Sequence, residues 1–155
     1  MPIHVVVAHI AVILAPISAL LALAYAIWPD ARGRLRWPLL VATAAALTTV
    51  IWAGLSGSSL YHSLDAAAKD AGSALPPPVF AHAHGSDLLS LAMVGLAALV
   101  AAFVWRLLSP GRTPDRVGRV AAGVLAVAAV ATIIATGLVL AQAIAAVWAQ
   151  QPHVS

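Results

Sequence analysis

The chain has 155 residues, of which 63% are hydrophobic and only 8% are charged, and its formal net charge is +3. A soluble domain carries about 25% charged residues because its surface must face water, so this composition excludes an ordinary water-soluble globule. The absence of cysteine excludes disulfides, thiolate metal sites, iron–sulfur clusters and the covalent attachment of c-type haem.

Four apolar stretches are each long enough to cross a membrane, which takes about 20 mostly apolar residues. In chain order they cover about 3–28, 37–60, 80–108 and 120–148. The first is too long for a signal peptide and has no Lys or Arg before it, so we expect it to stay in the mature protein. We predict an all-α integral membrane protein, a single transmembrane domain over 1–155 in which four helices form an up-down-up-down bundle.

The connectors between these stretches differ in length. The first and third are short and rich in Pro, Gly and Arg, as expected for tight helical hairpins. The middle connector covers about 61–79 and ends in three consecutive prolines, Pro76 to Pro78. Consecutive prolines favour an extended polyproline conformation and cannot continue a helix. Before them, residues 63–71 are compatible with a short, separate helix at the membrane surface.

The positive charges predict the orientation in the membrane. All seven Arg lie in the first and third connectors, 29–36 and 106–119, whereas the middle connector holds only Lys69. By the positive-inside rule, the two Arg-rich connectors are cytoplasmic and both termini lie outside. Short basic loops beside apolar spans do not form the continuous basic face that nucleic acid requires, so we expect the lipid bilayer and not nucleic acid as a partner.

Small residues predict where the helices approach one another closely. Gly54, Gly57 and Gly95 lie in the second and third spans. Helices in lipid associate largely through van der Waals contact, which small residues allow. We therefore expect these three glycines to lie at helix–helix contacts.

The expected topology places all the histidines at the end of the bundle opposite the arginines. They are His4, His9, His62, His82, His84 and His153. Ionisable residues inside a membrane are rare and are commonly functional. An α-helix turns by about 100° per residue. Two histidines of the same helix, such as His4 and His9, therefore point in different directions and cannot both face the bundle centre. We predict that His9 of the first span faces His84 of the third, with His82 as the alternative to His84.

Asp87 follows His84 by three residues and therefore shares its helix face. A carboxylate in this position commonly orients an imidazole that binds a metal. We expect Asp87 to orient the imidazole of the third span. His4, His62 and His153 are expected to reach the headgroup region.

Three functional interpretations follow, and all remain open at this point. Two imidazoles from facing helices suit the axial positions of haem b, which predicts an electron-transfer protein with His9 and His84 or His82 as ligands. Alternatively, the chain is a non-catalytic subunit of a larger membrane complex and binds no cofactor. The third interpretation is a Cu or Zn site on the outer side, with ligands from the set His9, His84, His62 and Asp87.

The sequence contains no nucleophile elbow, phosphate-binding loop or H-E-x-x-H motif. We therefore expect no independent catalytic activity.

His4 and His9 stand five residues apart at the start of a long apolar span, and Ala53–Gly57 form a small-residue segment before the later His82 and His84. This arrangement resembles a family of small bacterial four-span membrane proteins, catalogued as a domain of unknown function, whose members open with His-Pro-x-x-x-His-Phe-Pro. Here Val5 replaces the first proline, and Ile10-Ala11 replace Phe-Pro. The resemblance implies a bacterial cytoplasmic membrane protein in a redox setting, because some relatives occur beside or fused to c-type cytochrome modules. Such cytochromes, or other membrane subunits, are therefore expected partners.

Overall fold

The computed structural model describes residues 3–75, 77–112 and 115–148. Four long α-helices account for most of them: α1 (Ile3–Ile27), α2 (Arg32–Asp70), α3 (Pro77–Arg106) and α4 (Arg116–Trp148). A short 3-10 helix, η1 (Pro29–Ala31), joins α1 to α2. The described residues contain no strand. The all-α prediction is confirmed.

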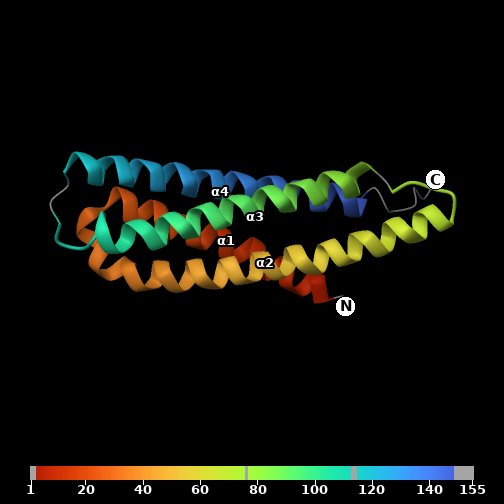
Figure 1. Cartoon of the computed structure of the whole chain (residues 1–155), viewed down its shortest axis with the longest axis horizontal. Coiled ribbons are helices and arrows are strands. Elements are labelled where there is room, and N and C mark those ends of the chain that lie inside the picture. The colour runs from red at the N-terminus through yellow and green to blue at the C-terminus, as the bar shows by residue number, and fades with distance from the viewer. Residues whose placement is uncertain (1–2, 76, 113–114, 149–155) are drawn as a thin grey trace.

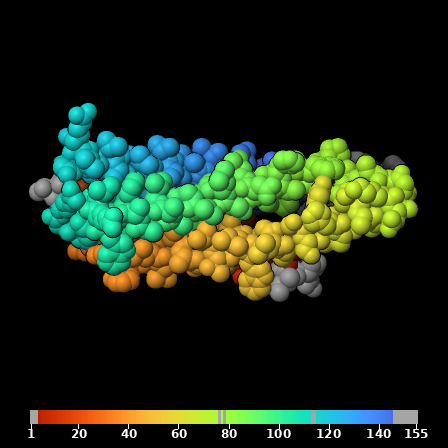
Figure 2. All heavy atoms as spheres, viewed as in Figure 1, coloured from red at the N-terminus to blue at the C-terminus, as the bar shows by residue number. Residues whose placement is uncertain are grey.

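The four helices form an elongated bundle in which successive helices run in opposite directions (Figures 1 and 2). α1 and α3 each pack on α2 and α4, and therefore occupy one diagonal of the bundle. All four helices are long and apolar enough to cross a membrane, which marks the chain as a membrane protein.

The core is built from small side chains on α1 and larger ones on α3. The buried alanines of α1 recur every three or four residues, at Ala11, Ala15, Ala19 and Ala22. This spacing places them on one helix face. The facing positions of α3 carry larger buried side chains, namely Leu89, Met93, Leu96, Val100 and Val104. The small side chains of α1 and the larger ones of α3 together fill the centre of the bundle.

The second helix is longer than the sequence predicts. α2 continues from the apolar stretch to Asp70, where a Lys69–Asp65 ion pair of 2.7 Å links successive turns. The expectation of a separate surface helix over 63–71 is therefore wrong, because these residues form the last turns of α2. This end projects past the start of α1 (Figure 1).

The proline segment also differs from the prediction. α3 begins at Pro77, so Pro77 and Pro78 are helical rather than extended, while Pro76 lies outside the described residues. The first backbone N–H groups of a helix have no partner within it. Proline, which lacks this group, is therefore tolerated in the first turn.

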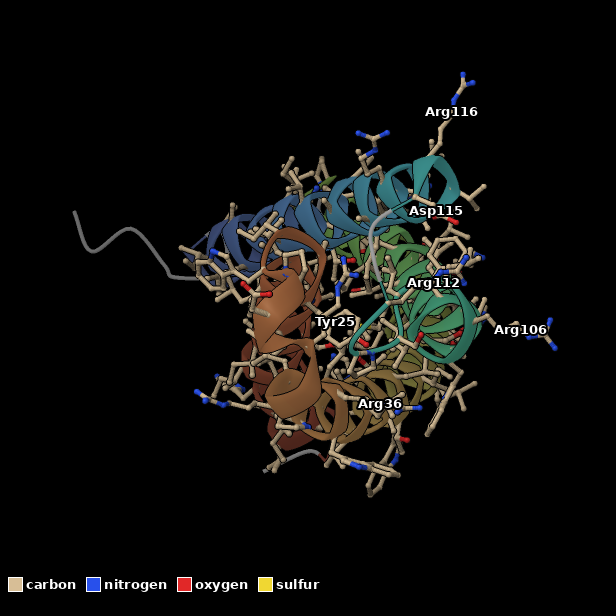
Figure 3. The ribbon with its side chains drawn as sticks, turned by 90° about the vertical axis from the view of Figure 1, so that its left-hand side faces the viewer. Tyr25, Arg36, Arg106, Arg112, Asp115 and Arg116 are labelled. Atoms are coloured by element: carbon tan, nitrogen blue, oxygen red, sulfur yellow. The ribbon has the colours of Figure 1, made fainter. Side chains whose placement is uncertain are left out.

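The arginine-rich end of the bundle is closed by polar contacts between helices. The hydroxyl of Tyr25, in the middle of this end in Figure 3, donates a hydrogen bond of 2.8 Å to the Leu108 carbonyl. Arg32 is buried, and its guanidinium donates to the carbonyls of Tyr25 at 3.1 Å and Ala26 at 3.3 Å. These carbonyls belong to the last turn of α1, where no backbone N–H of the same helix is available to bond to them. Arg32 thus caps α1 from the neighbouring helix.

The other arginines of this end divide into paired and outward-facing residues. The guanidinium of Arg36 lies 3.5 Å from the centre of the Trp105 ring, which is a cation–π contact. Arg106 and Arg116 extend away from the bundle (Figure 3).

Asp115 supplies the N-terminal cap of α4. Its carboxylate accepts a 2.7 Å hydrogen bond from the Gly118 backbone N–H and pairs with Arg112 at 2.9 Å. The Gly118 hydrogen bond, followed by the Arg112 contact, holds the pKa of Asp115 below its usual range. The carboxylate is therefore charged at neutral pH, which suits the positive end of a helix dipole.

The glycines predicted to lie at helix contacts behave differently from one another. A Cβ added to Gly57 would lie 2.7 Å from Cε1 of His4, and one added to Gly54 would lie 3.6 Å from the Ser90 hydroxyl. Gly95 is exposed, and no heavy atom would lie within 4 Å of its Cβ. The expectation of a close contact is therefore wrong for Gly95.

Gly57→Leu is expected to destabilise the bundle by about 1–3 kcal/mol, because the new side chain would overfill a packed position. Gly95→Leu places the same side chain toward lipid and should leave stability nearly unchanged. Thermal unfolding in detergent measures both. Equal melting temperatures for the two variants would contradict the packing described here.

Candidate functional site

The end of the bundle opposite the arginines contains two cavities. The outer cavity, of about 310 Å³, is lined mainly by 53–64 of α2 and 79–87 of α3. The deep cavity, of about 320 Å³, is lined by 4–13 of α1, 50–54 of α2, 82–90 of α3 and 139–143 of α4. Figure 2 shows the surface hollowed between α2 and α3 in this part of the molecule.

The two cavities share one wall. The residues that line both are His4, Ala53, Gly54, His82 and Ser86. His4 belongs to α1 and His82 to α3, the helices on the diagonal of the bundle. The shared wall therefore brings together two imidazoles from helices that make few direct contacts with each other.

His4 is held in a defined orientation by α2. Its Nδ1 lies 3.1 Å from the Ala53 carbonyl and 3.2 Å from the Ser56 hydroxyl, and its ring packs over Gly57. A carbonyl oxygen only accepts hydrogen bonds, so Nδ1 carries the proton. In a neutral imidazole this leaves Nε2 with the free lone pair. Nε2 of His4 is therefore the atom that a metal would bind.

His82 is half-buried, and its Nδ1 atom is buried with no hydrogen-bond partner among the described residues. A buried polar atom without a partner costs about 1–3 kcal/mol, so a ligand that binds Nδ1 would recover this energy. One turn further along α3, the Ser86 hydroxyl donates a 3.1 Å hydrogen bond to the His82 carbonyl. His82 therefore presents one buried ring nitrogen, Nδ1, that no described residue binds.

The predicted facing pair, His9 and His84, is not brought together. His9 is exposed at the edge of the deep cavity, and its Nδ1 donates to the Val5 carbonyl at 2.6 Å. His84 is exposed at the outer cavity, and its Nδ1 donates to the Phe80 carbonyl at 2.9 Å. The two residues line different cavities, so they do not face each other. His82, the predicted alternative, lines the deep cavity together with His9.

The remaining predicted metal ligands are also separated. Asp87 is exposed at the outer cavity beside His84, and the structure records no hydrogen bond from it to that imidazole. His62 is exposed on the projecting part of α2, where its ring meets Tyr61 edge to face. Within the described ranges, no three His, Asp or Glu side chains are grouped closely enough to hold a metal ion. His153 lies outside the described residues.

Sequence reasoning assigned His4 to the headgroup region and so missed its place in the shared wall. The signal that identifies it is the small-residue face of α1. Ala15 and Ala11 are buried, and the same spacing continues to Val7 and then to His4. His9 lies off this face, because it is neither three nor four residues from any of these positions.

Comparison with known proteins does not change this picture. No family model, curated protein sequence or solved structure matches the chain. The site must therefore be interpreted from its own chemistry: two imidazoles, small neighbouring residues and two adjoining cavities.

Proposed function

We propose that the chain is a membrane-embedded redox protein that holds haem b between α1 and α3, with His4 and His82 as the axial ligands. The observation that carries the proposal is the pair of imidazoles in the wall shared by the two cavities. Haem iron is commonly held by imidazole nitrogen, and helical bundles bind cofactors through side chains of facing helices. The hydrogen bond from His4 Nδ1 to Ala53 leaves the required Nε2 lone pair free.

The surroundings of the two imidazoles suit a flat, largely apolar group. Small residues of α2 line the outer cavity, and Tyr61 and Phe80 meet edge to face at its rim. Each cavity lies near the lower end of the range of about 300–1,000 Å³ that is typical of ligand sites.

The visible spectrum of the purified protein tests this proposal. Full-length chain made in a haem-replete host should show a Soret band and sharpened longer-wavelength bands on reduction, with iron in stoichiometric amount. A colourless protein that contains stoichiometric Cu or Zn would support the metal-binding alternative instead. A colourless protein without any of these metals would overturn both and leave the role of a non-catalytic subunit.

We also propose that the chain lies in the bacterial cytoplasmic membrane with its histidine end outside, where a c-type cytochrome is the expected partner. The support is the grouping of all seven Arg at one end, as the positive-inside rule requires.

Gly33→Cys should resist an impermeant thiol reagent in intact cells, while Ser73→Cys should react, because the two sites are both exposed and lie at opposite ends of the bundle. Gly111 is less suitable for this test, since its φ of 78° disfavours cysteine. Labelling in the reverse pattern would place the histidine end in the cytoplasm.

A further inference from the structure

The deep cavity opens sideways, toward lipid. Its rim includes Ile13 of α1, which is 60% exposed, and Leu140 of α4, which is 46% exposed. Its inner wall includes Leu89 and Val139, which are buried. Because α1 and α4 are neighbours in the bundle, the opening lies between these two helices and faces the hydrocarbon of the membrane. A ligand would therefore enter this cavity from the bilayer and not from water.

The polar side chains of the deep cavity are hydroxyls and imidazoles. The hydroxyls of Ser86 and Ser90 donate to helix carbonyls at 3.1 and 2.9 Å, so their oxygens remain free to accept. His9 at the rim uses Nδ1–H for the Val5 carbonyl, which leaves Nε2 as an acceptor. None of the residues that line the cavity is Arg, Lys, Asp or Glu.

We propose that the deep cavity binds the ring of a membrane quinol, whose isoprenoid tail stays in the lipid. Such a ring is neutral, and its hydroxyl groups can donate hydrogen bonds to the free serine oxygens and imidazole nitrogens of the wall. A phospholipid headgroup is a poorer match, because the lining offers no cation for its phosphate. A simple acyl chain would leave the polar groups unused, at the cost of burying them without partners.

The size of the cavity fits this ligand class. At about 320 Å³, it lies at the lower end of the range for ligand sites, about 300–1,000 Å³, which suits a substituted ring without its tail. The ring would lie beside His82, which also lines the outer cavity. Electron exchange between the quinol and haem rests on the proposed function, whereas binding of the quinol does not.

Binding can be measured under anaerobic conditions with full-length protein in detergent and a reduced ubiquinol analogue that carries a ten-carbon tail. Ultrafiltration compares its partition into protein-containing and empty micelles. We expect saturable, stoichiometric binding to the wild-type protein. Ala143→Leu should weaken binding by about tenfold or more, because it fills the cavity. Ala141→Leu, at an exposed position of the same helix, should bind as the wild type does, and melting temperatures verify that both variants fold.

The outcomes separate this inference from the proposed function. Quinol binding by a protein without haem would overturn the haem proposal alone. A haem spectrum without saturable quinol binding would overturn the quinol site alone. Equal loss of binding in Ala143→Leu and Ala141→Leu, or full competition by added phospholipid, would also contradict the site proposed here.

Discussion

His4→Ala is expected to abolish the haem spectrum, whereas His84→Ala should leave it unchanged. His4 lines the wall shared by both cavities and has its Nδ1 fixed on Ala53, while His84 is exposed and bonded to its own helix. Removal of an axial imidazole deletes a bond to the iron, so we expect complete loss of the native spectrum. His82→Ala should have the same effect. Spectra of each purified variant, oxidised and reduced, provide the measurement.

A rescue experiment distinguishes a ligand from a residue that only supports the fold. Added imidazole should restore a bis-imidazole spectrum to His4→Ala, because the small molecule can occupy the space left by the side chain. His62→Ala is the matched control, since His62 lines neither cavity. Retention of the full spectrum in both His4→Ala and His82→Ala would contradict the assignment. Loss in His84→Ala or His9→Ala would instead favour the pair predicted from the sequence.

Arg32→Ala is expected to destabilise the bundle by about 2–4 kcal/mol. The change removes two charge-assisted hydrogen bonds, and it leaves the Tyr25 and Ala26 carbonyls without their partner at a buried position. Arg34→Ala is the matched control, because Arg34 carries the same charge in the same connector but is exposed. Arg34→Ala should change the free energy of unfolding by no more than about 0.5 kcal/mol. Reversible unfolding in mixed detergent measures both variants, and equal stability would show that Arg32 does not hold the helix end.

The number and type of the helices could be predicted from hydropathy alone, because no other fold places four such apolar stretches in so short a chain. The position at which α2 ends could not be predicted from hydropathy. Hydropathy falls after Leu60, but the alanines and the Asp65–Lys69 pair favour continued helix in water. Hydropathy reports the solvent around a segment, so its fall after Leu60 marks where α2 leaves the apolar region and not where the helix ends.

The candidate site was predictable in part. Periodicity correctly excluded a shared orientation for His4 and His9, but it gives relative angles and not the direction of the bundle centre. That direction depends on which face of α1 packs, and the buried alanines of α1 determine it. The same limit applies to Gly57 and Gly95, because one meets a neighbouring side chain and the other meets lipid.

The length of α2 has a consequence for any water-soluble partner. With 39 residues against 25 in α1, and a rise of 1.5 Å per residue, α2 is about 58 Å long and α1 about 37 Å. A bilayer with its headgroups is about 40–45 Å thick, so the last turns of α2 stand in water at the histidine end. These turns of α2 stand beside the mouth of the outer cavity. A soluble protein that approaches the outer cavity would meet these turns on one side, which limits the directions from which it can reach the histidines.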